Sequence, residues 1–284
     1  MKKFLLASFF CAFLFINLFF KKNICAKEII YGTDKIITRA EVAKMISFIY
    51  GNKKDILECY KNREINFLDS EINDWFDKYI NFVFEKKIMT GTSENKFEPE
   101  KYLNLNQAQI LLDKINVDNK IKIKMDDENK NKFVSYSLWV KLFLDLLSDL
   151  EIKNIKQKEI IVLATHEQNK KDILKNFLVS EKNYFCCEGI DFDFYEKKVK
   201  VLVCEQEILA IINYDCDFDV EFKINKKTGN KIWVENDLIK RCFYLKKDLQ
   251  GKKINVNKNY VLKIKSGEVI DFVESNNFDE RKKN

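Results

Sequence analysis

One spacing of apolar residues recurs three times in the first half of the chain. Each copy begins with a residue that can cap a helix, namely Thr38, Asn104 or Ser135, and apolar side chains follow four, seven, eight and eleven positions later. This spacing places the apolar side chains on one face of an α-helix. Three helices with one pattern indicate an internal repeat, and chance similarity between amphipathic helices is the alternative. The partial copies cover residues 36–50, 67–116 and 134–150.

The first two predicted helix starts have the residues of a capping box. Glu41 follows Thr38 by three positions, and Gln107 follows Asn104 by three positions. In this arrangement the first side chain accepts a backbone N–H of the first turn, and the second side chain accepts the N–H of the capping residue. Ser135 can make the first of these bonds, but an apolar residue stands three positions after it.

Arg39 stands out because a cation in the first turn of a helix opposes the helix dipole. We therefore expect Arg39 to lie on an exposed first turn and to bind a ligand. The equivalent positions of the other two copies hold Leu105 and Tyr136, so only one copy carries the cation. A binding cation at this position is therefore expected in the first copy alone.

The segment between the first two copies has its own order of features. An aromatic-x-Asp start at Phe67 precedes a predicted helix led by Trp75. A turn around Gly91 follows, and then a Phe-Glu-Pro sequence that ends at Pro99, the only proline of the chain. Together with the Thr-Arg-Ala-Glu sequence of the first copy, this order resembles the S-layer homology (SLH) family over residues 36–150.

The resemblance implies attachment to the bacterial cell wall. SLH modules bind pyruvylated secondary cell-wall polysaccharide in grooves between three pseudo-repeated units. The resemblance further implies that Arg39 and Trp75 contact the polysaccharide. A guanidinium can hold a carboxylate through two parallel hydrogen bonds, and an indole face can lie against a sugar ring. A half-buried core position is the alternative for Trp75.

The first 26 residues have the layout of a secretory signal peptide. Two lysines precede an apolar run over residues 4–20, and Ala26 is a plausible last residue of the leader. The alternative is a membrane anchor formed by residues 4–20, whose length is at the short limit of a spanning helix. We therefore expect a secreted protein of the cell wall or cell surface.

The charge pattern does not indicate a nucleic-acid partner. The chain has a net charge of +6, and four lysines of the leader account for four of these charges, which leaves +2 for the remainder. Acidic and basic residues alternate along the remainder, as is typical of a solvated surface. We expect no nucleic-acid partner, and membrane contact only through the N-terminal segment.

Beyond residue 157 the helical period gives way to short apolar runs that flank turns at 205–206 and 266–267. Such pairs of runs predict β-hairpins and therefore a small antiparallel β-barrel or sandwich. The expected fold class is α+β with two domains, an SLH-like α domain of three helical repeats and a β domain. The predicted units are a signal peptide (1–26), the α domain (27–150), the β domain (157–274) and a charged tail (275–284).

The second half resembles, over the runs 159–165, 198–212 and 259–273, the accessory region of clostridial proteins of the stage II sporulation protein D type. Those proteins are amidase enhancers or peptidoglycan-modifying factors. The resemblance implies an alternative function, an accessory or truncated form of such an enhancer with a peptidoglycan amidase as partner. The domain that carries the activity of that family would lie further along, so no catalytic residue is carried over.

Few residues could support catalysis or a metal site. His166 is the only histidine, which makes a two-histidine zinc site impossible. None of the six cysteines after the leader forms a CxxC pair, and they could be free thiols or disulfides. We therefore expect a non-enzymatic protein without metal or cofactor. An activator of wall remodelling and a hydrolase in its own right are the competing hypotheses.

Overall fold

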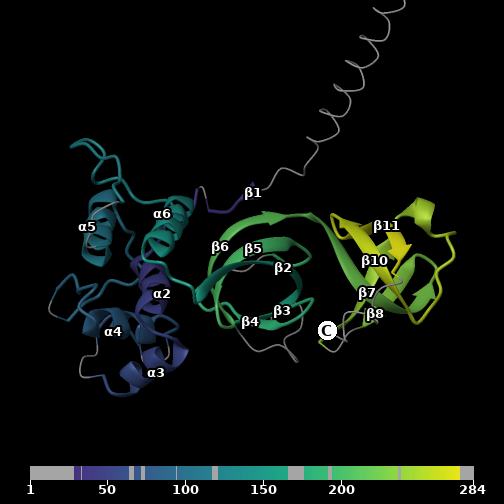
Figure 1. The fold of residues 1–284 in the computed structure, drawn as a ribbon, viewed down its shortest axis with the longest axis horizontal. Coiled ribbons are helices and arrows are strands. Elements are labelled where there is room, and N and C mark those ends of the chain that lie inside the picture. Colours follow the sequence, from purple (N-terminus) through teal and green to yellow (C-terminus); the bar gives the residue numbers. More distant parts are fainter. Residues whose placement is uncertain are drawn as a thin grey trace, which may run out of the picture.

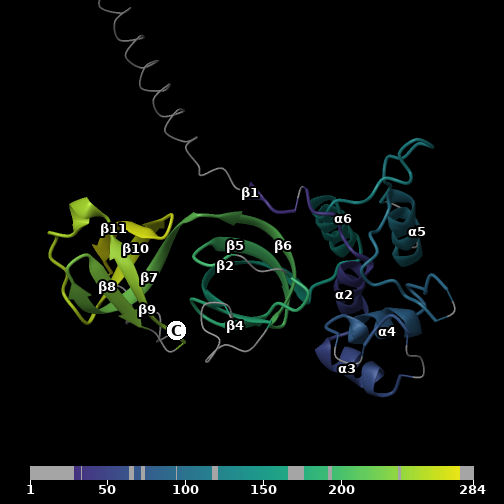
Figure 2. The same ribbon diagram turned by 180° about the vertical axis from the view of Figure 1, so that it is seen from behind.

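The computed structural model contains a helical module followed by two groups of strands (Figures 1 and 2). No helix within the described residues is both long and apolar enough to span a bilayer. The described residues are 29–32, 34–63, 67–71, 74–93, 95–116, 121–165, 176–190, 194–235 and 238–275. The predicted signal peptide, most of the predicted charged tail and His166 lie outside these ranges.

Five α-helices form the described part of the helical module, which we define as residues 35–149. They are α2 (Arg39–Tyr50), α3 (Lys53–Lys61), α4 (Asp77–Glu85), α5 (Leu105–Ile115) and α6 (Tyr136–Asp149). The apolar positions that predicted three of these helices face the core, because Val42, Leu112 and Phe143 are each at most 1% exposed. Helix α2 is buried from Arg39 to Phe48, and its buried side chains include the polar ones of Lys44 and Ser47.

The strands form two separate units, which we call the first and the second β unit. The first unit contains β1 (Ile29–Ile30), β2 (Ile155–Thr165), β3 (Phe177–Ser180), β4 (Tyr184–Cys186), β5 (Lys198–Cys204) and β6 (Glu207–Asp215). The second contains β7 (Asp217–Thr228), β8 (Lys231–Glu235), β9 (Lys240–Leu245), a 3₁₀ turn (Lys247–Leu249), β10 (Lys258–Lys265) and β11 (Glu268–Glu274).

Both β units contain parallel as well as antiparallel pairs. The first has the order β1-β6-β4-β3-β2-β5, and β5 also pairs with β6. The second closes as a barrel in the order β10-β11-β9-β8-β7. Strands β4 and β6 are parallel, and so are β9 and β11. The prediction of one purely antiparallel β domain is therefore wrong, because hairpin signals report neighbouring strands and not the parallel contacts that join distant ones.

The helical module and one part of the first β unit share a hydrophobic core, and the strands of that unit enclose a further core of their own. Leu202, Leu209 and Ala210 of the sheet belong to the same buried cluster as the five helices. Strand β1 lies inside the predicted α domain but pairs with β6 of the sheet. The second β unit has a core of its own, to which Ile161 and Leu163 of β2 also contribute.

Candidate functional site

The starts of α2, α5 and α6 meet in a closed ring of backbone hydrogen bonds. The residue before each helix cap donates its N–H to the carbonyl of the equivalent residue in another segment. Ile37 bonds Val134 (3.1 Å), Val134 bonds Leu103 (2.9 Å) and Leu103 bonds Ile37 (3.1 Å). All three side chains are at most 1% exposed. The three segments therefore surround one shared centre.

The first amides of the three helices are satisfied by neighbouring segments. The first four N–H groups of any helix lack partners within that helix. In each of these helices the first N–H group donates to a carbonyl of a neighbouring segment of the ring. Arg39 donates to the Lys101 carbonyl (2.9 Å), Leu105 to the Lys132 carbonyl (2.9 Å) and Tyr136 to the Lys35 carbonyl (2.7 Å). The backbone arrangement is thus the same at three positions whose side chains differ in chemistry.

Side chains cap the third amide of each of these helices. Thr38 accepts the Glu41 N–H (3.3 Å), while the Glu41 carboxylate accepts the Thr38 N–H (2.9 Å). Asn104 and Gln107 form the same reciprocal pair. Ser135 accepts one amide of the first turn of α6, without a reciprocal bond.

Arg39 is buried, with 7% of its surface exposed, so the expectation of an exposed cation is wrong. Its Nε donates to the Phe97 carbonyl (2.9 Å) and its Nη2 donates to the Thr90 carbonyl (2.8 Å). The guanidinium also lies 4.6 Å from the centre of the Phe97 ring. Desolvation lowers the pKa of Arg39, against the opposing effects of Glu98 and Asp69. The side chain thus ties the start of α2 to the loop before Pro99.

Trp75 is half-buried between the helical module and the first β unit. Its ring packs edge-on against Phe76 with a centroid distance of 5.4 Å. Gly189 has a φ of +70°, and a Cβ at this position would collide with the Trp75 ring. A backbone without a side chain therefore lies against the indole. Trp75 contacts Phe76 and Gly189, whereas Arg39 contacts Phe97 and Thr90. No described contact joins Trp75 to Arg39.

A buried ion pair joins α2 to β6. The Lys44 ammonium lies 2.8 Å from Glu207 Oε1, and both side chains are at most 2% exposed. The same ammonium donates to the carbonyls of Glu188 (2.6 Å) and Ile208 (2.8 Å). Three acceptors thus surround a lysine that is closed off from water, which is the condition for burying a charge without a large penalty.

Further charged groups surround this ion pair. Lys53 of α3 lies 3.5 Å from Glu207 Oε2, and Lys78 of α4 pairs with Glu188. Desolvation raises the pKa of Glu207, but Lys44, Lys53 and the hydrogen bonds to the carboxylate outweigh it, so the pKa is lower than usual. Burial raises the pKa of Tyr79, whose hydroxyl lies 3.3 Å from Glu188 Oε2.

Cys186, Glu188 and Glu207 have ligand atoms within 4.8 Å of one another, a grouping that could suit a metal ion. The Lys44 ammonium, however, already neutralises Glu207 within this cluster. Desolvation and the nearby carboxylates raise the pKa of Cys186 to about 11, so its thiol is protonated at neutral pH. These properties fit an interdomain ion pair better than a metal centre. All six cysteines of the described residues are free.

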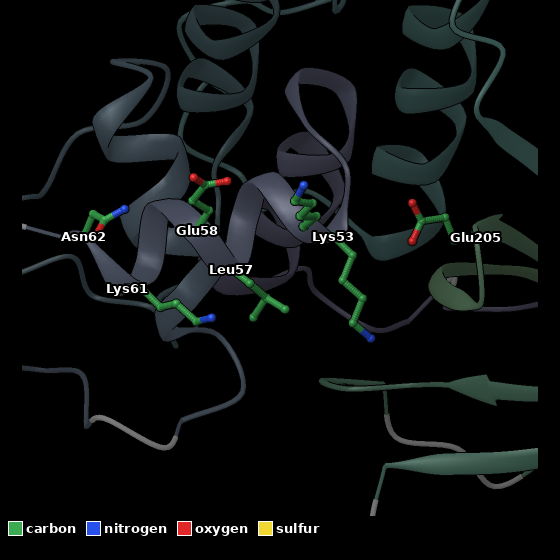
Figure 3. A pocket seen from close by; sticks show the side chains of 7 residues that line it. Lys53, Leu57, Glu58, Lys61, Asn62 and Glu205 are labelled. Atoms are coloured by element: carbon green, nitrogen blue, oxygen red, sulfur yellow. The ribbon is translucent and has the colours of Figure 1, made fainter.

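A shallow cavity of about 710 Å³ lies between α3 and the β5–β6 turn. Figure 3 shows Lys53 and Lys61 on α3 beside Leu57, with Glu205 projecting from the turn. Neither Arg39 nor Trp75 lines this cavity.

The order of these elements supports the family resemblance found in the sequence. Residues 66–108 match the S-layer homology domain. The matched range contains Trp75, helix α4 and Pro99, and it ends inside α5. This SLH domain indicates association with the cell surface. No curated protein matches the chain. The resemblance of the second half to stage II sporulation protein D stays a prediction.

Sequence reasoning missed Lys44 and Glu207, which form the most buried ion pair of the described residues. The available signal was a lysine inside the apolar run of α2, between Ala43 and Met45. Glu207 had no comparable signal, since an acidic residue after a two-residue turn is an ordinary hairpin feature.

Proposed function

We propose that this protein is held at the bacterial cell surface by its helical module, which binds a wall polysaccharide, and that it has no catalytic activity. The observation that carries the proposal is the SLH match over residues 66–108. The backbone ring supports it further, because this ring includes the helix starts at residues 36–39 and 133–136, outside the matched range. In the ring, each of the three segments donates one backbone N–H to a second segment and accepts one backbone N–H from the third.

The first β unit acts in this proposal as a rigid extension of the module. Its shared core and the Lys44–Glu207 pair favour a fixed orientation of the two parts. The polysaccharide contacts of Arg39 and Trp75 stay predictions, and the hydrogen bonds of Arg39 and the packing contacts of Trp75 within the chain weigh against them. Burial raises the pKa values of Cys186 and Cys187, which disfavours the nucleophilic thiolate at these two positions.

Co-sedimentation of the purified protein with bacterial cell walls tests this function. One half of each wall sample is first extracted with acid to remove the secondary polysaccharide. We expect retention on untreated walls and loss of retention on extracted walls. Equal retention on both would show that the ligand is not this polysaccharide, and no retention on either would refute wall attachment. Release of soluble peptidoglycan fragments during the incubation would contradict the non-enzymatic role.

A further inference from the structure

Two of the three places where helix starts meet are filled by the chain itself. Between the first and second segments, the Arg39 side chain occupies the space beside Phe97. Between the third and first segments, the Tyr136 hydroxyl accepts the N–H of Ile211 in β6 (3.1 Å), and the Tyr31 ring packs on Tyr136. A ligand could reach either place only by displacing buried contacts.

The faces of α2 and α4 that point toward the strands are covered as well. Lys44 is enclosed by β6 and the loop after β4, and Gly189 lies against Trp75. Helix α5, by contrast, lies at the side of the module away from the strands in both views (Figures 1 and 2). The segment before α5, which pairs with the segment before α6 through Asn104 and Phe133, therefore lies on the part of the ring away from the strands.

Two exposed aromatic side chains lie on this part of the ring. Tyr102 is 45% exposed and Phe133 is 56% exposed, and the rings meet edge to face with centroids 5.5 Å apart. Both belong to the ring segments, since Tyr102 pairs with Thr38 and Phe133 pairs with Asn104. In an extended backbone successive side chains point to opposite sides. The next residues, Leu103 and Val134, point into the core, so the aromatic rings point out.

We propose that the Tyr102–Phe133 pair is the surface on which the helical module binds a sugar ring of the wall polysaccharide. This inference rests on the proposed function and deepens it. Contiguous exposed apolar surface is typical of binding sites, and aromatic rings offer broad contact area with little loss of conformational entropy. The Tyr102 hydroxyl adds a polar group at the edge of the surface.

The charges next to the rings are of mixed sign, since Lys101 and Lys132 precede the two rings while Glu98 and Glu100 lie on the same loop as Lys101. Lys101 already bonds Glu98 at the surface (2.8 Å). The sugar ligand is therefore inferred from the two rings and from the place of Tyr102 within the matched residues 66–108, and not from charge.

The double variant Tyr102→Ala/Phe133→Ala tests the surface by co-sedimentation with untreated walls. Loss of two central aromatic contacts should weaken retention by about tenfold or more. Tyr244→Ala is the matched control, because Tyr244 is 46% exposed on the second β unit. The conservative variant Phe133→Tyr keeps the ring and should retain wild-type binding. Thermal unfolding midpoints of all variants show whether each is folded.

The outcomes separate this inference from the proposed function. Failure of the wild-type protein to bind walls would refute both. Wild-type binding together with equal binding of the folded double variant would overturn the aromatic surface and leave wall attachment intact. An equal loss in Tyr244→Ala would also overturn it, because the binding surface would then include the second β unit. Loss confined to the double variant supports the inference.

Discussion

Arg39 and Lys44 are two buried cations on the same helix, but they are satisfied in different ways. Arg39 bonds two neutral carbonyls inside the helical module, at Phe97 and Thr90. Lys44 bonds a carboxylate and two carbonyls of the first β unit. One helix therefore organises its own module through Arg39 and attaches that module to the strands through Lys44.

The comparison shows that charge alone does not identify a binding residue. The two carbonyl partners of Arg39 fix the orientation of its side chain. A buried ion pair, in turn, depends on both of its members, because removal of one leaves the other charge without compensation. The two cations should therefore respond differently to mutation.

The largest effect is expected at the ion pair. Lys44→Met leaves the Glu207 carboxylate buried with only the more distant Lys53, and the free energy of unfolding should fall by about 3–5 kcal/mol. The double variant Lys44→Met/Glu207→Leu removes both charges and should recover most of this loss. Urea unfolding of the wild type, both single variants and the double variant measures the coupling. Additive losses would show that the two side chains do not depend on each other.

A smaller effect is expected at Arg39. Arg39→Ala removes two charge-assisted hydrogen bonds and leaves two carbonyls unpaired, so the free energy of unfolding should fall by about 2–3 kcal/mol. Arg39→Lys keeps the charge but lacks the planar fork that reaches both carbonyls, and it should lie between the alanine variant and the wild type. A stability of Arg39→Ala equal to that of the wild type would contradict the role assigned to these bonds.

The Tyr136 hydroxyl should have a modest effect. Tyr136→Phe leaves the N–H of Ile211 without its partner and should lower the free energy of unfolding by about 1–2 kcal/mol. Tyr102→Phe removes a hydroxyl from an exposed ring and serves as the control, with little expected change. Similar losses in both variants would mean that the Tyr136–Ile211 bond does not join α6 to β6.

The pH dependence of stability should be the subtlest difference. The pKa of Glu207 is lowered in the folded protein, so its contribution is present above its unfolded pKa and is lost as the pH falls through the folded pKa. Stability of the wild type should therefore fall more steeply below about pH 4 than that of Lys44→Met/Glu207→Leu. Urea midpoints measured across this range check the sign. If the urea midpoints of the two proteins change in parallel with pH, Glu207 does not contribute to the loss of stability in acid.

Local sequence signals predicted the helix starts well. Thr38, Asn104 and Ser135 are capping residues in the structure, because capping depends on side chains within three positions of one another. The helical period of the apolar residues in α2, α5 and α6 could also be predicted, because it too depends on residues close together in the sequence. The ring of backbone hydrogen bonds that joins the starts of these three helices could not be predicted from the sequence. Backbone hydrogen bonds between distant segments do not require particular residue types.

The candidate site shows where local reasoning fails. The dipole argument placed Arg39 on an exposed turn, yet its carbonyl partners at Thr90 and Phe97 are 51 and 58 positions away. Glu207 lies 163 positions from Lys44 in the chain. The exposure of Phe133 could not be predicted either, because phenylalanine is among the residues most often buried.

The retention of two folded variants on cell walls, measured side by side, tests the account most directly. Arg39→Lys alters a residue that acts inside the module, and Tyr102→Ala/Phe133→Ala alters the exposed aromatic surface. At a temperature well below both unfolding midpoints, we predict that Arg39→Lys binds walls like the wild type and that the aromatic variant binds about tenfold more weakly. Loss of binding in Arg39→Lys with full binding of the aromatic variant would contradict the account.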